Sequence, residues 1–462
     1  MNKNSYTGSP DPGFPQEKKN LVFIFMESME TSYGDKKHGG FEDKSLIPNL
    51  TTLAMNGETF TSDMTESWGA YSLPGSTCTA FATVAELSGM PFSVYEKANT
   101  NTLGTILSDG GYRQVYILGS DASFGGKKGF FENRGKYTVM DYTYMKEHGK
   151  LKSDEYENWG YNDKKLFEFA EDEISTIAKT NDPFNVTILT SDTHTPGYVY
   201  AETGVTGTKR YKTSIRESDK QIWDFISWMK QQSFYKNTVI VLVGDHPSMM
   251  PIYKDVSAIK RTVYFTILNS DKIPERLDRA FSTYDIFPTV LSALGIDTPS
   301  KKLGIGTDLY SGEDTIIEQY GLKYVMNELS KRQNTDSIYK LDDKNALSTG
   351  VGNTGFITNY NDSTAVKNGI IAWIITYSLV SVIFYFSLRY VIYNKHFSIS
   401  FLIAIAAGFL IGLSYKLTAG VAASLILWGA IIFIHFGRNY GKAENRQTDA
   451  LGKEAVKNNA VS

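Results

Sequence analysis

Short apolar segments rich in β-branched and aromatic residues recur over the first two thirds of the chain, and longer segments with helical spacing separate them. Short apolar runs are typical of buried strands, whereas apolar positions three and four residues apart are typical of amphipathic helices. Strands are predicted at residues 20–26, 112–119, 184–190, 239–244 and 262–268, and helices at 163–179 and 215–232. This alternation predicts an α/β fold with a mostly parallel sheet covered on both faces.

The hydropathy changes near residue 368, where three long apolar segments begin. The first segment is long enough to cross a bilayer, and the other two are somewhat short but free of charge. Because three such segments follow one another with Trp and Tyr near their ends, three transmembrane helices are favoured over a buried helical hairpin. The apolar segments are residues 370–388, 398–414 and 421–436. The predicted organisation is a linker (1–19), a large domain (20–337), a polar linker (338–367), three transmembrane helices (368–437) and a basic tail (438–462).

Basic residues around these segments predict their orientation in the membrane. Arg389 and Lys395 lie between the first two segments, and five further basic residues follow the third. The positive-inside rule therefore places the tail in the cytoplasm and the large domain outside the cell membrane. Because neither a signal peptide nor a spanning helix begins the sequence, we expect upstream membrane helices that this chain lacks, with export driven by the later helices as the alternative.

Net charge and cysteine content bear on nucleic-acid binding, disulfides and thiolate metal sites. The formal net charge of the 462 residues is −3, which gives no reason to expect nucleic acid as a partner. Cys78 is the single cysteine, so an internal disulfide and a thiolate metal cluster are both excluded.

Polar residues follow three of the predicted strands directly. Glu27 ends the first strand, Asp245 and His246 end the fourth, and the third runs into Asp192 and His194. In open α/β sheets the ligand crevice lies at the carboxyl ends of the strands. A buried Asp–His pair is costly unless it is compensated, most commonly by a divalent cation. The sequence therefore predicts a metal site at this edge of the sheet.

Five motifs carry a resemblance to known enzymes. Residues 47–60, 237–246 and 285–295 resemble, in family order, the early helix, the metal strand and the late helix of sulfatases and their relatives in the alkaline phosphatase superfamily. Glu27-Ser28 and residues 192–196 resemble the membrane phosphoglycerol transferases, which include lipoteichoic acid synthases and enzymes that modify osmoregulated periplasmic glucans. The resemblance covers roughly residues 20–296 and implies a doubly wound α/β domain with metal-assisted phosphoryl transfer.

The resemblance also implies a nucleophile at the start of a helix, where free backbone N–H groups stabilise a phosphate. A Gly- and Pro-containing loop from Gly69 runs into an Ala-rich segment, and the distance to Gly89-Met90-Pro91 assigns Thr79. Thr77 is the alternative nucleophile, and either residue is also a candidate helix cap. Conversion of Cys78 to formylglycine needs a Pro and an Arg shortly after it. Ala80 and Ala82 stand there instead, which argues against sulfatase activity.

The implied metal ligands are Glu27, Thr79, Asp245 and His246, a mixed oxygen and nitrogen shell that suits Mn²⁺, with Mg²⁺ or Zn²⁺ as alternatives. His194 is expected to contact the phosphate or to protonate the leaving oxygen. Substrate contacts are also expected from Asp121, Lys127 and Arg134. Glu30 is an alternative ligand to Glu27, and His38 and His148 are expected to be exposed.

Three classes of function remain. The resemblance favours transfer of phosphoglycerol from phosphatidylglycerol to a surface glycan or polyglycerol phosphate through a phosphothreonine-type intermediate. Phosphoethanolamine transfer or phosphodiester hydrolysis on the same scaffold is the second, and a non-catalytic relative that binds lipid head groups is the third. The membrane segments favour a lipid substrate, and nothing in the sequence identifies the acceptor.

Overall fold

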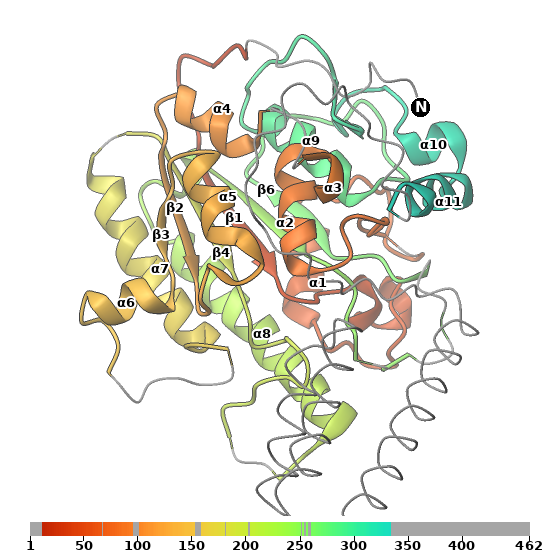
Figure 1. Ribbon diagram of the computed structural model, residues 1–462. Helices are drawn as coiled ribbons and strands as arrows, with labels where there is room; N and C mark the ends of the chain where they lie inside the picture. Colours follow the sequence, from red (N-terminus) through yellow and green to blue (C-terminus); the bar gives the residue numbers. More distant parts are fainter. Residues whose placement is uncertain are drawn as a thin grey trace, which may run out of the picture. The chain divides into compact units, whose positions relative to one another are not determined.

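The structure is a computed structural model that describes part of the chain (Figure 1). The described residues are 12–333 without residues 67, 96–100, 153–158, 181, 202–203, 251, 254–255 and 257–259. All of them belong to the first of two units, residues 1–345. The linker at 338–367, the predicted transmembrane segments at 368–437, the tail at 438–462 and most of the linker at 1–19 lie outside them. Among the described residues, none of the helices is long and apolar enough to span a membrane.

A six-stranded sheet forms the centre of the described part, in the order β3-β2-β4-β1-β5-β6. All neighbouring strands are parallel except β5 and β6, which are antiparallel. The strands are β1 (Asn20–Met26), β2 (Arg113–Leu118), β3 (Thr138–Met140), β4 (Phe184–Leu189), β5 (Thr238–Gly244) and β6 (Phe265–Leu268). Nearly every residue of β1, β4 and β5 is buried, as expected for central strands with both faces covered.

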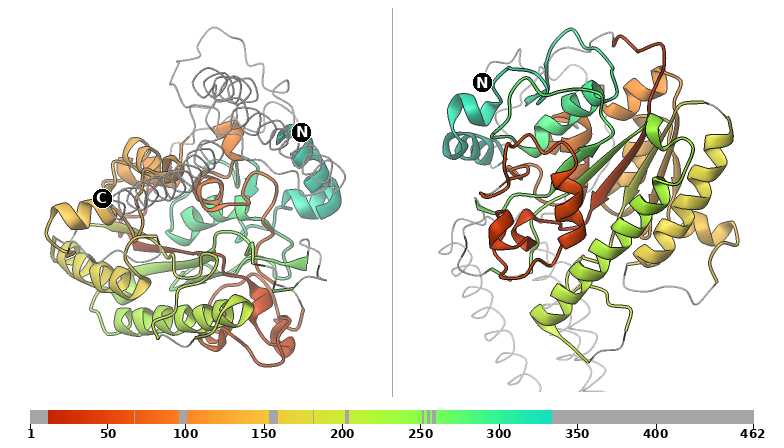
Figure 2. Two further views of the ribbon diagram at one scale, coloured as in Figure 1. Left: turned by 60° about the horizontal axis from the view of Figure 1, so that its bottom comes forward. Right: turned by 180° about the vertical axis from the view of Figure 1, so that it is seen from behind.

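Helices cover both faces of this sheet (Figure 2). Alternate residues of β1 enter opposite cores: Val22 and Ile24 pack with helices α1, α7 and α8, whereas Phe23 and Phe25 pack with α2, α4, α5 and α9. These helices are α1 (Pro48–Met55), α2 (Thr79–Ser88), α4 (Leu103–Asp109), α5 (Lys127–Asn133), α7 (Asp163–Ile177), α8 (Gly207–Met229) and α9 (Ile286–Ala293). The sheet is therefore buried on both faces, and loops continue from the ends of its strands.

Smaller elements complete the described part. The remaining helices are α3 (Phe92–Tyr95), α6 (Tyr142–Glu147), α10 (Ile316–Tyr320) and α11 (Leu322–Gln333), and β7 (Lys302–Leu303) pairs with β8 (Gly306–Thr307). Leu73, Tyr284 and Ile317 belong to a third, smaller core that also includes residues of α11.

The predicted mostly parallel α/β sheet is confirmed, with corrections to individual elements. The fifth predicted strand is shorter than expected, since β6 begins at Phe265 rather than at Thr262, and it runs antiparallel to its neighbour. Helix α8 begins at Gly207, eight residues before the predicted start, because its first turns are polar and lack the apolar spacing used for the prediction.

Candidate active site

Glu27 and Asp245 are brought together by the register of two parallel strands. Met26, the last residue of β1, pairs with Gly244, the last residue of β5, so the next residue of each strand lies side by side. Both carboxylates continue the alternation that points toward the core beneath α2. The backbone N–H of Ser28 donates to Asp245 Oδ1 at 2.7 Å and ties the two strand ends together.

Gly244 permits this close approach. A Cβ at this position would lie 1.9 Å from the carbonyl oxygen of Met29, so a side chain there would displace the turn that follows Glu27. The turn itself contains Ser28 at a φ of 52°, a left-handed conformation that is uncommon outside glycine.

His246 presents Nε2 to the two carboxylates. Its Nδ1 lies 2.9 Å from the carbonyl oxygen of Pro247, and a carbonyl only accepts, so Nδ1 carries the proton and Nε2 offers a lone pair in the neutral ring. Nε2 lies 3.6 Å from Glu27 Oε1 and 3.4 Å from Asp245 Oδ2. A histidine held by a backbone carbonyl in this way is the usual arrangement of a metal ligand.

Thr79 is the first residue of α2, and its hydroxyl meets the same group. Thr79 Oγ1 donates to Glu27 Oε2 at 3.0 Å and lies 3.4 Å from His246 Nε2. Cys78, immediately before it, is extended and exposed, and the preceding Ser76 is buried with its hydroxyl bonded to Leu73 O. Thr77, the alternative nucleophile, is exposed.

The electrostatics of this group fit a divalent cation. Burial, and then the charge of Glu27, raise the pKa of Asp245 to about 7. Burial would also raise the pKa of Glu27, but His246 and His194 outweigh it and the pKa is lowered. Asp245 Oδ2 is buried and accepts no hydrogen bond from the described residues. One ligand atom from each of Glu27, Asp245 and His246 lies within 4.8 Å of the others, which makes them a possible metal site.

His194 lies in the loop after β4, the strand next to β1. Its Nδ1 donates to the carbonyl oxygen of Thr195 at 3.1 Å, which leaves Nε2 for a ligand. The ring meets Trp159 edge-on with centroids 4.6 Å apart. Asp163, the first residue of α7, fixes the start of this loop by accepting hydrogen bonds from the backbone N–H groups of Ser191 and Asp192.

Lys127 is a buried ammonium beside the site. Nζ donates to the carbonyl oxygen of Phe124 at 2.6 Å and lies 5.3 Å from the centroid of the Phe124 ring. Burial lowers the pKa of Lys127, and the negative charges of Glu27 and Asp121 offset part of that effect. Asp121 is exposed and accepts the backbone N–H of Ser123 at 2.8 Å, so it stabilises the turn that leads to Lys127.

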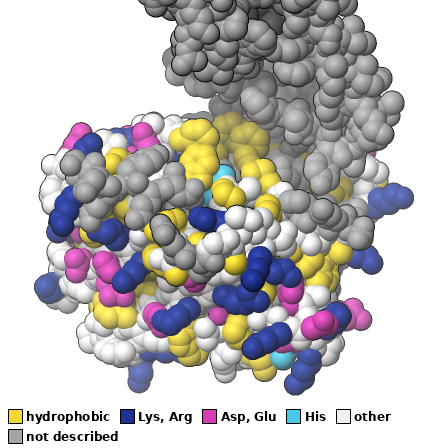
Figure 3. All heavy atoms as spheres, turned by 90° about the horizontal axis from the view of Figure 1, so that it is seen from below, with side chains coloured by type: hydrophobic (Ala, Val, Ile, Leu, Met, Phe, Trp, Pro, Cys, Tyr) yellow, Lys and Arg dark blue, Asp and Glu magenta, His cyan; other side chains and the backbone are white. Residues whose placement is uncertain are grey.

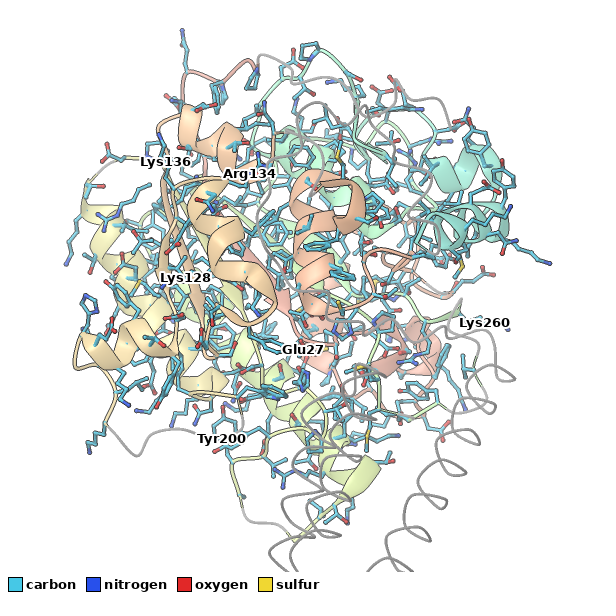
Figure 4. All side chains as sticks on the ribbon, in the orientation of Figure 1. Glu27, Lys128, Arg134, Lys136, Tyr200 and Lys260 are labelled. Atoms are coloured by element: carbon cyan, nitrogen blue, oxygen red, sulfur yellow. The ribbon has the colours of Figure 1, made fainter. Side chains whose placement is uncertain are left out.

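Arg134 is not brought to the site. It follows the last residue of α5, whereas Lys127 begins that helix, so the two are separated by about 10 Å along the axis. In Figure 4 its label lies at the end of α5 away from Glu27. Arg134 was a phosphate candidate because a guanidinium binds phosphate in a bidentate fork, and the sequence pattern gave no sign that a helix begins at Lys127.

Glu30 is occupied by a different partner. It is fully buried and forms a bidentate ion pair with Arg261, and it accepts the N–H of Ser248 at 2.7 Å and the hydroxyl of Ser32 at 2.6 Å. Glu30 is therefore a structural anchor for the segment after His246. His38 is partly exposed and paired with Asp35 at 2.8 Å, and His148 is exposed and stacked on Tyr144.

Sequence reasoning did not find three residues that support the site. Thr193 donates its hydroxyl to the carbonyl oxygen of Glu27 at 2.5 Å. Trp159 contacts His194, and Arg261 binds Glu30. The sequence could have indicated Thr193, since it lies between Asp192 and His194. Trp159 and Arg261 gave no signal, because each comes from a segment remote in sequence from its partner.

Comparison with known proteins gives a family match and related sequences. Residues 19–296 match the family model described as Sulfatase. Phosphoglycerol transferase I of Xanthomonas campestris pv. campestris is 30% identical over 315 residues, which cover 64% of this chain and 43% of that protein. Phosphoglycerol transferase I of Escherichia fergusonii is 29% identical over 333 residues, covering 67% of this chain and 41% of that protein. The chain thus spans less than half the length of these curated relatives, and the resemblance predicted from the motifs is confirmed.

Solved structures share the fold. A protein of the alkaline phosphatase superfamily from Vibrio parahaemolyticus superposes with a TM-score of 0.54 at 23% identity, covering 68% of this chain and 74% of that one. A lipoteichoic acid synthase from Listeria monocytogenes superposes with a TM-score of 0.51 at 18% identity, covering 64% of this chain and 77% of that one. At these identities the likeness shows the fold alone.

Proposed function

This chain belongs to the sulfatase family, and from that premise we propose that it transfers a phosphoglycerol group from phosphatidylglycerol to a cell-surface glycan or polyglycerol phosphate. The observation that carries the proposal is the position of the Thr79 hydroxyl, 3.0 Å from Glu27 Oε2 and 3.4 Å from His246 Nε2 at the start of α2. The choice of phosphoglycerol as the transferred group rests on the relatives named phosphoglycerol transferase I.

The reaction follows from the hydrogen bonds of Thr79. Its hydroxyl hydrogen points at Glu27, which gives the proton an acceptor as the oxygen attacks phosphorus. The bond from phosphorus to the diacylglycerol oxygen breaks, and phosphoglycerol remains attached to Thr79. An acceptor hydroxyl then attacks the same phosphorus and the bond from phosphorus to Thr79 Oγ1 breaks. Glu27 returns the proton to Oγ1, and the neutral His194 takes the proton of the acceptor hydroxyl.

His194 and Lys127 serve the departing and transferred groups. His194, as the imidazolium with Nδ1–H held by the carbonyl oxygen of Thr195, gives its Nε2 proton to the departing diacylglycerol oxygen and becomes neutral. The buried ammonium of Lys127 balances the negative charge of the phosphate. Asp121, exposed at the start of the same loop, binds the glycerol hydroxyls.

Glu27, Asp245, His246 and the Thr79 oxygen would hold a divalent cation, for which we propose Mn²⁺. Such an ion lowers the pKa of a coordinated hydroxyl and screens the charge of the phosphate. Asp245 Oδ2, which is buried and accepts no hydrogen bond from the described residues, supports this assignment. We further propose that the catalytic domain lies on the outer face of the cell membrane, as the basic residues predict.

The test is release of diacylglycerol from fluorescent phosphatidylglycerol by the purified chain with added Mn²⁺. Thr79→Ala should lose activity by at least about a thousandfold, because the covalent intermediate then lacks its oxygen. Mass spectrometry of the quenched wild-type reaction should find phosphoglycerol on Thr79.

Thr77→Ala is the matched control, since this threonine is exposed two residues away, and it should retain activity within about twofold. Undiminished release by Thr79→Ala would refute the proposal. Glycerol phosphate that appears free in solution even when a glycan acceptor is supplied would identify a hydrolase instead.

A further inference from the structure

Three exposed apolar side chains stand beside the candidate active site. Phe124 is 71% exposed, Met249 69% and Trp159 39%. All three lie in segments near the carboxyl ends of the parallel strands: Phe124 follows β2, Met249 follows β5 and Trp159 precedes α7. Figure 3, which looks onto this face, shows hydrophobic side chains gathered around a histidine. We call these three residues the apolar rim.

The apolar rim is continuous with the polar site. Phe124 lies 6.3 Å from Trp159 between ring centroids, and Trp159 meets His194 at 4.6 Å. The carbonyl oxygen of Phe124 holds Lys127 Nζ. Met249 follows His246 by three residues, within about 11 Å along the chain. A ligand whose phosphate lies between Lys127 and His194 therefore has the apolar rim beside its remaining atoms.

We propose that the apolar rim binds the acyl chains of a donor phospholipid where they join the glycerol backbone. This inference rests on the proposed function and adds to it a basis for preferring an acylated donor over a soluble phosphodiester. The order of chemistry from the site outward is carboxylates and cations, then uncharged apolar surface. An amphiphile with an anionic head group has the same order, so charge and polarity are complementary along its whole length.

The side chains favour a lipid over a sugar. The two most exposed members, Phe124 and Met249, carry no hydrogen-bonding atom on their side chains, whereas a sugar site needs polar groups for its hydroxyls. Methionine is flexible and adapts to irregular apolar partners such as acyl chains. Exposed apolar side chains that cluster at a site mark contact with a ligand or a membrane.

The experiment compares two donors that share one phosphodiester. Dihexanoyl phosphatidylglycerol carries short acyl chains and glycerophosphoglycerol carries none. The double variant Phe124→Ser, Met249→Ser should raise KM for the acylated donor about tenfold. It should lower kcat/KM for glycerophosphoglycerol by no more than about threefold, through the lost contact of the Phe124 ring with Lys127. Phe124→Leu, Met249→Leu keeps the apolar surface and should restore the KM.

Ile273→Ser is the matched control for loss of exposed apolar surface. Ile273 is 87% exposed and follows β6, which runs antiparallel, so it lies at the opposite edge of the sheet. This variant should leave both donors unaffected. Equal losses on both donors, or a loss confined to the KM of a glycan acceptor, would overturn the assignment of the apolar rim to acyl chains.

A second measurement separates this inference from the proposed reaction. Calorimetric binding of dihexanoyl phosphatidylglycerol to Thr79→Ala needs no turnover. Adding the two serine substitutions should raise the Kd about tenfold. If the wild-type chain cleaved neither donor, the proposed function would fail. The difference in Kd would still show whether the apolar rim binds acyl chains. Equal Kd values would overturn it.

Discussion

At the scale of the residue, Glu27 and Glu30 differ in what neutralises their charge. Both are buried, three residues apart after β1. Glu30 has a guanidinium partner in Arg261 and accepts hydrogen bonds from Ser248 and Ser32. Glu27 instead faces Asp245, and burial together with the charge of Glu27 raises the pKa of Asp245. A buried carboxylate pair of this kind is stable when a cation joins it.

Glu27→Gln should therefore separate metal binding from stability. We expect the affinity for Mn²⁺ to fall by at least about a hundredfold, since a charged ligand is lost. The metal-free chain should keep or gain stability, because the substitution removes the repulsion of Asp245. Calorimetric titration with Mn²⁺ and urea unfolding with chelator measure the two effects. Unchanged Mn²⁺ affinity would remove Glu27 from the ligand set.

Glu30→Gln should show the opposite pattern. Breaking its buried ion pair leaves Arg261 without its counter-charge, which should lower the free energy of unfolding by about 3–5 kcal/mol. Metal affinity of the folded fraction should change much less than in Glu27→Gln. A stable Glu30→Gln variant that no longer bound Mn²⁺ would show that Glu30 is a ligand.

Individual site residues were predictable where a strand end fixes them. Glu27 and Asp245 each directly follow a strand, His246 is the next residue after Asp245, and the strand ends are visible in the sequence. The position of Arg134 was not predictable in this way, because it depends on the start and direction of the short helix α5. Gly125 and Gly126, both left-handed, set that start and leave no hydrophobic pattern.

At the scale of the element, α2 carries Thr79 at its first residue and is anchored at its other end. Gly89 ends the helix with a φ of 68° and donates its N–H to Ala85 O at 2.8 Å. A Cβ on Gly89 would lie 2.5 Å from the carbonyl oxygen of Leu303, which belongs to β7. The end of α2 is thus fitted against the backbone of a neighbouring strand.

Gly89→Ala and Gly111→Ala should differ in stability for this reason. Gly111 also has a positive φ, 78°, but open space surrounds the position of its Cβ. Gly111→Ala should cost about 1 kcal/mol for the left-handed backbone alone, and Gly89→Ala about 1–3 kcal/mol more for the contact. Urea unfolding of both variants measures the difference. Equal losses in the free energy of unfolding would mean that the strand beside Gly89 shifts to accommodate the added Cβ.

The central strands were predictable and the peripheral elements were not. β1, β4 and β5 are apolar on both faces, so their sequences stand out. β3 has three residues and gives no periodic signal. β6 pairs with β5 in the antiparallel direction, and the local pattern of apolar residues does not encode the direction of a strand.

At the scale of the whole molecule, buried carboxylates join distant elements of the described domain. Asp219 of α8 accepts the backbone N–H groups of Asn49 and Leu50 at the start of α1. Asp285, before α9, accepts those of Ser282 and Thr307 of β8. Burial outweighs these hydrogen bonds and raises the pKa of each carboxyl to about 6.

These two carboxyls should make the folded domain more stable in mild acid. Each has a higher pKa folded than unfolded, so the native state binds more protons and stability falls as pH rises from about 4 through 6. The upper bound is on the order of 3 kcal/mol for each group. Urea unfolding of the full chain in detergent with chelator, at a series of pH values, measures the slope. Asp219→Asn removes one titrating group and should flatten it, whereas an unchanged slope would show that Asp219 is ionised in the folded domain at pH 5.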